Sequence, residues 1–158
     1  MTKILHNDYV INRNTQALLP GMHMDYDTKV IETNQILYVN KRIIEIVKND
    51  CLEGGSTYDG RRIAVTKKMG FGRKQPIPIY PHLGIIAFPT KSPDTYDCVW
   101  IFPQHVKRII TTPTGESEIF FKDGQSIVVN ESRFVLEKQI QRSAICILIF
   151  RGEDSFPA

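Results

Sequence analysis

Six basic side chains and no acidic one occur between Gly60 and Lys74. They are Arg61, Arg62, Lys67, Lys68, Arg73 and Lys74. Guanidinium and ammonium groups bind phosphate oxygens, so this composition suits contact with an anionic polymer. The remaining 14 basic residues are set against 17 acidic ones, and the positive charge is therefore local. The pattern predicts an anionic partner, such as nucleic acid, an acidic protein or a membrane surface, or else only a solvated helix face.

Glycines before this cluster suggest catalytic motifs, and none of these motifs is complete. Gly55 and Gly60 have the spacing of a P-loop, but Arg62 stands where a hydroxyl must bind Mg²⁺. A nucleophile elbow needs G-x-S-x-G, and Tyr58 replaces its second glycine. We therefore expect no enzyme, no catalytic residue, no bound metal and no cofactor.

The cysteines and histidines also lack the spacing of a metal site. Cys51, Cys98 and Cys146 are too far apart for a metal knuckle and too few for a disulfide framework. We expect three structural thiols, and His105 as a hydrogen-bonded structural histidine. The N-terminus lacks the apolar core of a signal peptide, and no apolar run approaches the roughly 20 residues that span a bilayer. These features predict a cytoplasmic protein with no membrane partner.

A helix over residues 56–69 must carry most of the basic cluster. Ser56 or Thr57 is suited to cap its beginning, or to bind a phosphate through backbone N–H groups, and Gly70 is suited to end it. At about 100° per residue, one apolar stripe faces a core and consists of Tyr58, Val65 and Met69. Arg61 and Lys68 then lie on one flank of that stripe and Arg62 on the other.

The rest of the chain reads mainly as strands. Two short strands are expected on either side of Asn34, and Asp123-Gly124 predicts a type I′ hairpin. Asn130 is suited to cap a second helix over residues 131–143. The segment 41–50 fits a short helix or a strand, and the proline-rich RKQPIPIYP predicts an extended connector.

These elements predict the α+β class, with a mainly antiparallel sheet or a partly open barrel and about two helices. We expect one domain over residues 1–158. Residues 1–28 are expected to be irregular, and residues 151–158 are expected to form a flexible tail.

Several short blocks match a known family in order and spacing. They are YVN at 38–40, Cys51 with Gly55-Ser56, Tyr58, Gly60 and Arg61, Pro76-Ile77, Phe88-Pro89-Thr90 with Ser92, Cys98 and Trp100, and His105-Val106-Lys107. Over residues 28–145 the chain resembles the competence transcription factor family (ComK) of Gram-positive bacteria. A fainter similarity relates IFPQHVKRI, the hairpin and VVNESRFVLEKQI to LytTR-type DNA-binding domains.

The first resemblance implies a transcription activator of competence genes that binds double-stranded DNA at A/T-rich boxes, mainly through the minor groove. It also implies homodimers, and two dimers on one promoter. Family members continue for some tens of residues beyond the position of Phe150, and that extension is associated with activation and adaptor-mediated proteolysis. The resemblance therefore supports DNA binding more directly than it supports those two properties.

With the family in view, the basic cluster is the expected DNA-binding surface. Lys107, Arg108 and Arg133 are second-rank candidates, and the similarity to LytTR domains places Arg133 at the start of a DNA-facing helix. Tyr58 and Trp100 are expected to be scaffold residues rather than base-stacking platforms. The alternative function is a protein-interaction module whose basic surface binds an acidic partner and not DNA.

Overall fold

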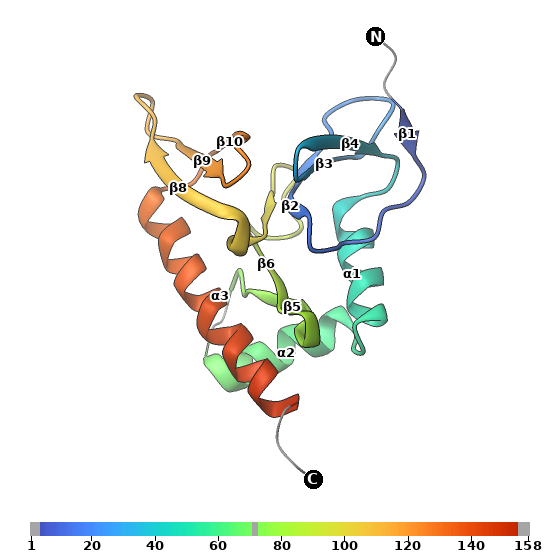
Figure 1. The fold of residues 1–158 in the computed structure, drawn as a ribbon, viewed down its shortest axis with the longest axis vertical. Coiled ribbons are helices and arrows are strands. Elements are labelled where there is room, and N and C mark those ends of the chain that lie inside the picture. Colours follow the sequence, from blue (N-terminus) through green and yellow to red (C-terminus); the bar gives the residue numbers. More distant parts are fainter. Residues whose placement is uncertain (1–3, 71–72, 155–158) are drawn as a thin grey trace.

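A seven-stranded sheet forms the centre of the molecule in the computed structural model, which describes residues 4–70 and 73–154, the last three by backbone alone (Figure 1). The strand order is β1–β4–β3–β2–β7–β6–β5. The strands are β1 (Leu5–His6), β2 (Thr15–Pro20), β3 (Thr28–Glu32), β4 (Gln35–Val39), β5 (Ile77–Tyr80), β6 (Ile85–Pro89) and β7 (Trp100–Ile101). All neighbouring strands are antiparallel except β1 and β4.

A smaller antiparallel sheet and three helices complete the described residues. The sheet has the order β10–β9–β8, with β8 (Val106–Thr111), β9 (Ser117–Phe121) and β10 (Ser126–Val129). The helices are α1 (Ile43–Glu53), α2 (Tyr58–Met69) and α3 (Arg133–Asp154), with short 3₁₀ turns η1 (Pro81–Leu83) and η2 (Pro103–His105). The predicted α+β class is confirmed, and neither sheet closes into a barrel.

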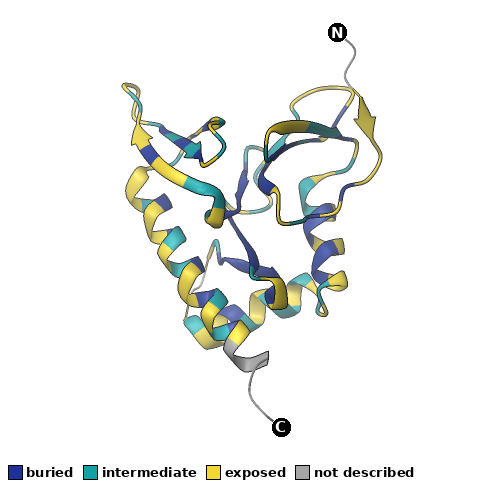
Figure 2. Cartoon of the chain, viewed as in Figure 1, coloured by how far each residue is buried: buried dark blue, intermediate teal, exposed yellow. Residues whose placement is uncertain are grey.

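The middle of the central sheet is buried on both faces, whereas β1 and much of β4 are exposed. Leu18 and Trp100 are paired across β2 and β7, and both pack on the face that α1 covers. The next pair, Ala17 and Ile101, packs on the opposite face against the small sheet and the start of α3. All four side chains are at most 2% exposed, and the middle strands are accordingly dark in Figure 2. Burial on two faces explains why this β-sheet needs helices on one side and a second sheet on the other.

Helices α2 and α3 meet beside β5 and β6. Their contact is a small core of Val65 from α2, Ile86 from β6, and Cys146 and Phe150 from α3. In Figure 1, α2 runs along the lower end of the molecule and α3 descends to meet it. Within the described part of the chain, no helix has the length and apolar character needed to cross a membrane.

Three expectations about individual segments are corrected, and one open alternative is decided. Residues 1–28 are not irregular throughout, because 15–20 form β2, an inner strand of the sheet. The ambiguous segment 41–50 belongs to helix α1. The proline-rich connector forms β5, and β5 is an edge strand, where Pro78 removes no ladder hydrogen bond from an inner position.

The last correction concerns α3, which is longer than predicted. It continues beyond position 143 to Asp154 because apolar side chains in its second half pack on α2 and β6. The tail expected at 151–158 is therefore helical up to Asp154, and residues 155–158 lie outside the described part. The residue that caps the start of α3 also differs from the prediction. The hydroxyl of Ser132, and not the side chain of Asn130, accepts from the backbone N–H of Val135 at 3.2 Å.

The Asp123-Gly124 turn joins β9 to β10 as predicted, but its type differs. A type I′ turn needs positive φ at both residues. Gly124 has φ of 96°, whereas Asp123 is not among the described non-glycine residues with positive φ. The Asp123 carboxylate instead accepts from the backbone N–H of Asn34 at 2.8 Å, while the Gln125 amide donates to the carbonyl of Glu32 at 2.8 Å. These bonds attach the small sheet to the β3–β4 turn.

Because of this attachment, the free energy of unfolding should depend on pH in the acid range. Burial alone would raise the pKa of Asp123, but hydrogen bonds from Asn34 and Gln125 outweigh it and lower the pKa to about 2. The ionised carboxylate therefore contributes stability above its usual pKa, and the contribution is lost as pH falls from about 4 through 2. We expect Asp123→Ala to lower the free energy of unfolding at pH 6, and the deficit relative to wild type to shrink toward pH 2 in urea titrations. A deficit that is the same at both pH values would contradict this role, and Asp25→Ala, in the exposed β2–β3 loop, is the matched carboxylate control.

Candidate nucleic-acid interface

Helix α2 begins and ends where its sequence predicts. Thr57 is the N-cap, and its hydroxyl accepts from the backbone N–H of Gly60 at 2.9 Å. Gly70 ends the helix in a left-handed conformation with φ of 75°, and its N–H donates to the carbonyl of Thr66. Phe71 and Gly72, which follow Gly70 and precede Arg73, lie outside the described residues.

The turn between α1 and α2 is fixed by a close contact with β5. A Cβ atom added to Gly54 would lie 2.0 Å from the carbonyl oxygen of Ile79. Only glycine therefore allows the end of α1 to approach the β5 backbone at this position. The contact determines where the chain turns into α2.

Arg61 is directed into this turn and is only partly exposed. Its Nη2 donates to the Gly54 carbonyl at 2.8 Å, so its positive charge lies at the C-terminal end of α1. Its Nε is buried and has no hydrogen-bond partner among the described residues. Burial raises the pKa of Cys51 to about 12, and the charge of Arg61 opposes part of that shift. The guanidinium of Arg61 therefore serves as a structural cap in this fold, and its contact with DNA stays a prediction.

Three of the predicted cations, and one that was not predicted, line a single hollow of about 630 Å³ between α1, α2 and the Pro89–Asp94 segment. The four are Lys48, Arg62, Arg73 and Lys74, and we call the hollow the Lys48 cleft. Two carboxylates, from Asp59 and Asp94, also line it. Arg62 lies 3.5 Å from Asp59, and both side chains are largely exposed.

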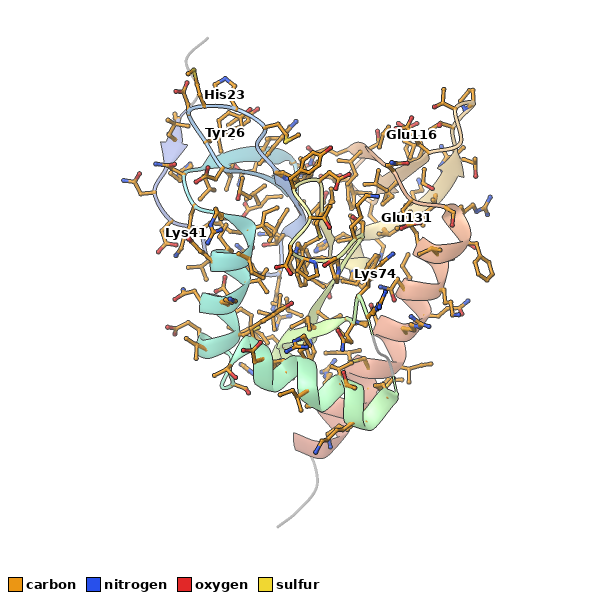
Figure 3. All side chains as sticks on the ribbon, turned by 180° about the vertical axis from the view of Figure 1, so that it is seen from behind. His23, Tyr26, Lys41, Lys74, Glu116 and Glu131 are labelled. Atoms are coloured by element: carbon orange, nitrogen blue, oxygen red, sulfur yellow. The ribbon has the colours of Figure 1, made fainter. Side chains whose placement is uncertain are left out.

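Lys74 is held in place from two sides. Its Nζ lies 3.3 Å from a carboxylate oxygen of Glu131, next to the start of α3 (Figure 3). Its carbonyl accepts from Nε2 of Gln139, which is buried in α3, at 2.6 Å. The Lys74 backbone has φ of 51°, a left-handed conformation that costs a non-glycine residue of order 1 kcal/mol or more. The surrounding hydrogen bonds therefore stabilise a strained position at the mouth of the cleft.

The other basic residues of α2 lie elsewhere on the helix. Lys67 and Lys68 are exposed, and at about 100° per residue Lys67 lies on the side opposite the buried Val65. Arg62 and Lys68 are on opposite flanks, as the sequence predicts.

The second-rank candidates are placed in other parts of the molecule. Lys107 and Arg108 are exposed on β8, which Figure 1 shows in the upper part, away from α2. The Arg108 guanidinium lies 4.7 Å from the centre of the Phe120 ring. Arg133 begins α3, and its Nε donates to Glu137 at 2.8 Å.

The nine predicted residues thus do not form one cationic face. The fold brings together Arg62, Arg73 and Lys74, directs Arg61 inward, and distributes the others over α2, β8 and α3. Sequence analysis missed Lys48 because the segment 41–50 was ambiguous. A helix at that segment would have shown that Lys48 follows Ile44 by one turn, on the same face.

The cysteines and aromatic residues of the matching blocks are mostly scaffold. Tyr58 and Trp100 are in edge-to-face contact with ring centres 6.4 Å apart, and Trp100 is 2% exposed. Cys51 and Cys98 pack in the same core, and burial raises the pKa of both thiols. The three cysteines are unpaired and buried, which confirms the prediction of structural thiols.

Comparisons with known proteins identify relatives along nearly the whole chain. A family model described as "ComK protein" matches residues 6–154. The chain is 32% identical over 137 residues to the Competence transcription factor of Bacillus subtilis (strain 168), a match that spans 86% of this chain and 71% of that protein. No solved structure matches.

The Arg61 contact leads to a stability prediction. We expect Arg61→Ala to reduce the free energy of unfolding by about 1–3 kcal/mol, because the partly buried Gly54 carbonyl loses a charged donor. Lys67→Ala, on the exposed side of the same helix, should change it by less than about 0.5 kcal/mol. Urea denaturation followed by circular dichroism measures both. Equal stabilities of the two variants would show that the guanidinium does not cap α1.

The steric contact of Gly54 can be tested with a matched glycine. We expect Gly54→Ala to destabilise the protein by about 3 kcal/mol or more, since the clash is with rigid backbone. An added Cβ at Gly60 would meet only the Ser56 and Thr57 hydroxyls at 2.9 Å, and alanine improves helix propensity there by about 1 kcal/mol. Gly60→Ala should therefore be close to neutral in thermal unfolding. A Gly54→Ala protein as stable as wild type would rule out the proposed constraint.

Proposed function

The chain belongs to the ComK family of competence proteins, and on this basis we propose that it is a transcription regulator of competence genes that binds double-stranded DNA. The observation that carries this proposal is the 32% identity to the Competence transcription factor over 86% of the chain. An identity at this level over most of a domain supports a common fold and a related role. We propose a non-catalytic function that needs no cofactor, carried out inside the cell.

The region around α2 is the part of the molecule best suited to meet DNA. Lys67 lies on its outer side, and the long side chains of Arg62 and Lys68 extend from its flanks. Arg73 and Lys74 follow the helix at the mouth of the Lys48 cleft. Together these five cations define the α2 surface, which is the DNA-binding surface that we propose.

The ion pairs within this surface do not exclude DNA. Arg62 pairs with Asp59 and Lys74 with Glu131, at 3.5 and 3.3 Å, and most of these side chains are partly exposed. Exposed ion pairs contribute only about 0–1 kcal/mol each. A phosphate can therefore replace either carboxylate as the partner at little cost.

A/T-rich DNA and its minor groove are the proposed target. The minor groove of A/T-rich DNA is narrow and strongly negative, which favours insertion of arginine. It offers only a degenerate hydrogen-bonding code, so a protein that reads it relies on groove shape and phosphate contacts. The scaffold fits this mode. Three of its positive side chains extend from α2 and two from the segment that follows it, so the proposed contacts do not come from one dedicated recognition helix. We propose activation of transcription by homodimers, two of which assemble on one promoter.

A gel-shift experiment over a salt series tests the proposal. If the α2 surface neutralises about five phosphates, log K should fall with log salt with a slope on the order of −4 to −5, and an A/T-rich duplex should bind more tightly than a G/C-rich one. The combined variant Lys67→Ala, Lys68→Ala and Arg73→Ala should reduce the magnitude of the slope by about 2–3 and weaken binding to both duplexes.

The charge-matched control is Lys122→Ala, in the exposed β9–β10 turn, which should bind DNA like wild type. If neither duplex is retained at low salt, DNA binding is rejected. The alternative of a basic surface for an acidic protein would then explain the cations.

A further inference from the structure

The Lys48 cleft has the size of a ligand site. Its volume of about 630 Å³ lies within the range of roughly 300–1,000 Å³ that is usual for small-molecule pockets. Its walls come from α1, α2, the residues that follow α2, and the Pro89–Asp94 segment. Residues distant in sequence therefore contribute to one concave surface.

The cleft carries an excess of positive charge. Four cations and two carboxylates line it. Arg62 pairs with Asp59 inside the cleft, and Lys74 pairs with Glu131, which is outside its lining. Among the residues that the structure describes, Lys48 and Arg73 have no carboxylate within ion-pair distance. The carboxylate of Asp94 lines the same hollow and offsets part of this charge, so the four cations together with Asp59, Asp94 and Glu131 leave a net charge of +1, which favours an anion over a cation.

Neutral donors accompany these cations. Tyr58 and Ser92, which each carry a hydroxyl, line the same cleft. The Tyr58 phenol keeps its proton at neutral pH and remains a donor, as it would at the ordinary tyrosine pKa, and burial raises its pKa further, to about 12. A guanidinium, ammonium groups and hydroxyls are the donors that a tetrahedral oxyanion with several acceptor oxygens requires.

The mouth of the cleft is preorganised. Lys74 is kept in a left-handed conformation, and Gln139 of α3 holds its carbonyl at 2.6 Å. The neighbouring Gln75 is buried and donates to the Thr66 hydroxyl at 2.6 Å. Bonds from two helices thus fix the segment that carries two of the four cations, and a fixed site loses less entropy when a ligand binds.

We propose that the Lys48 cleft is a binding site for a phosphate group. The phosphate contacts Lys48, Arg73 and Lys74, with Tyr58 as a neutral donor. It belongs either to the backbone of bound DNA or to a free phosphorylated small molecule. The site itself follows from the geometry of the cleft, and its assignment to the DNA backbone rests on the proposed function.

Isothermal titration of the full chain with pyrophosphate, at an ionic strength kept constant with sodium chloride, tests the site. We expect saturable binding of one pyrophosphate per chain. Lys48→Ala and Arg73→Ala should each weaken it about tenfold or more, as expected for the loss of one charge-assisted contact. Lys122→Ala, which removes an exposed charge far from the cleft, should leave the affinity unchanged.

Lys74→Gly separates a role in binding from a role in folding. Glycine removes the cation and also relieves the left-handed backbone. We expect weaker pyrophosphate binding, by about tenfold, together with a midpoint of thermal unfolding that is unchanged or raised. Absence of saturable binding to wild type, or an equal loss in Lys122→Ala, would overturn the proposal.

Adding an A/T-rich duplex to the same titration identifies the source of the phosphate. Displacement of pyrophosphate by the duplex assigns the cleft to the DNA backbone, whereas simultaneous binding of both assigns it to a free phosphorylated molecule. Pyrophosphate binding without any duplex binding would reject the proposed DNA function and support the phosphate site. Duplex binding that Lys48→Ala leaves intact, with no pyrophosphate binding, would reject the phosphate site and keep the proposed function.

Discussion

The close approach of α1 to the backbone of β5 determines much of the candidate interface. At Gly54 there is no room for a side chain, because the Ile79 carbonyl occupies the position that a Cβ would take. The chain must turn at that point, Thr57 starts the next helix, and Arg61 closes the turn by donating to the Gly54 carbonyl. The direction of α2 is thereby fixed, and so is the flank from which Arg62 enters the cleft. The steric requirement at Gly54 thus determines where α2 and its charged side chains lie, although Gly54 itself carries no charge.

The blocks that reveal the family are largely those that build this scaffold. Cys51, Cys98 and Trp100 share one core, and Tyr58 packs against its edge. These blocks therefore include residues that attach α1 and α2 to the sheet. Most of the cations proposed to meet DNA lie outside these blocks, and Arg61, which is inside them, is a helix cap. Family resemblance and the position of the binding surface are separate questions in this protein, because the first depends on buried side chains and the second on exposed ones.

Elements with strong local signals could be predicted from the sequence. Thr57 and Gly70 define the two ends of α2, and the turns at Asn34 and Asp123-Gly124 produce the two predicted hairpins. Strand β2 was missed because its short apolar run becomes an inner strand through pairing with β7, which is distant in sequence, as well as with the neighbouring β3.

The charge distribution was beyond sequence reasoning for a similar reason. The predicted cluster was contiguous in sequence, but a helix distributes successive side chains around its axis, and the inward position of Arg61 depends on where α1 ends. Lys48 joins Arg73 only through the packing of α1 beside α2. One copy consequently presents about five cations near α2, while Lys107, Arg108 and Arg133 lie elsewhere. Because affinity for DNA rises with the number of phosphates neutralised, two copies on one duplex would double that number, and linking them would make the second contact effectively intramolecular. The modest charge of a single chain, +3 overall, is thus the physical argument for the proposed homodimer.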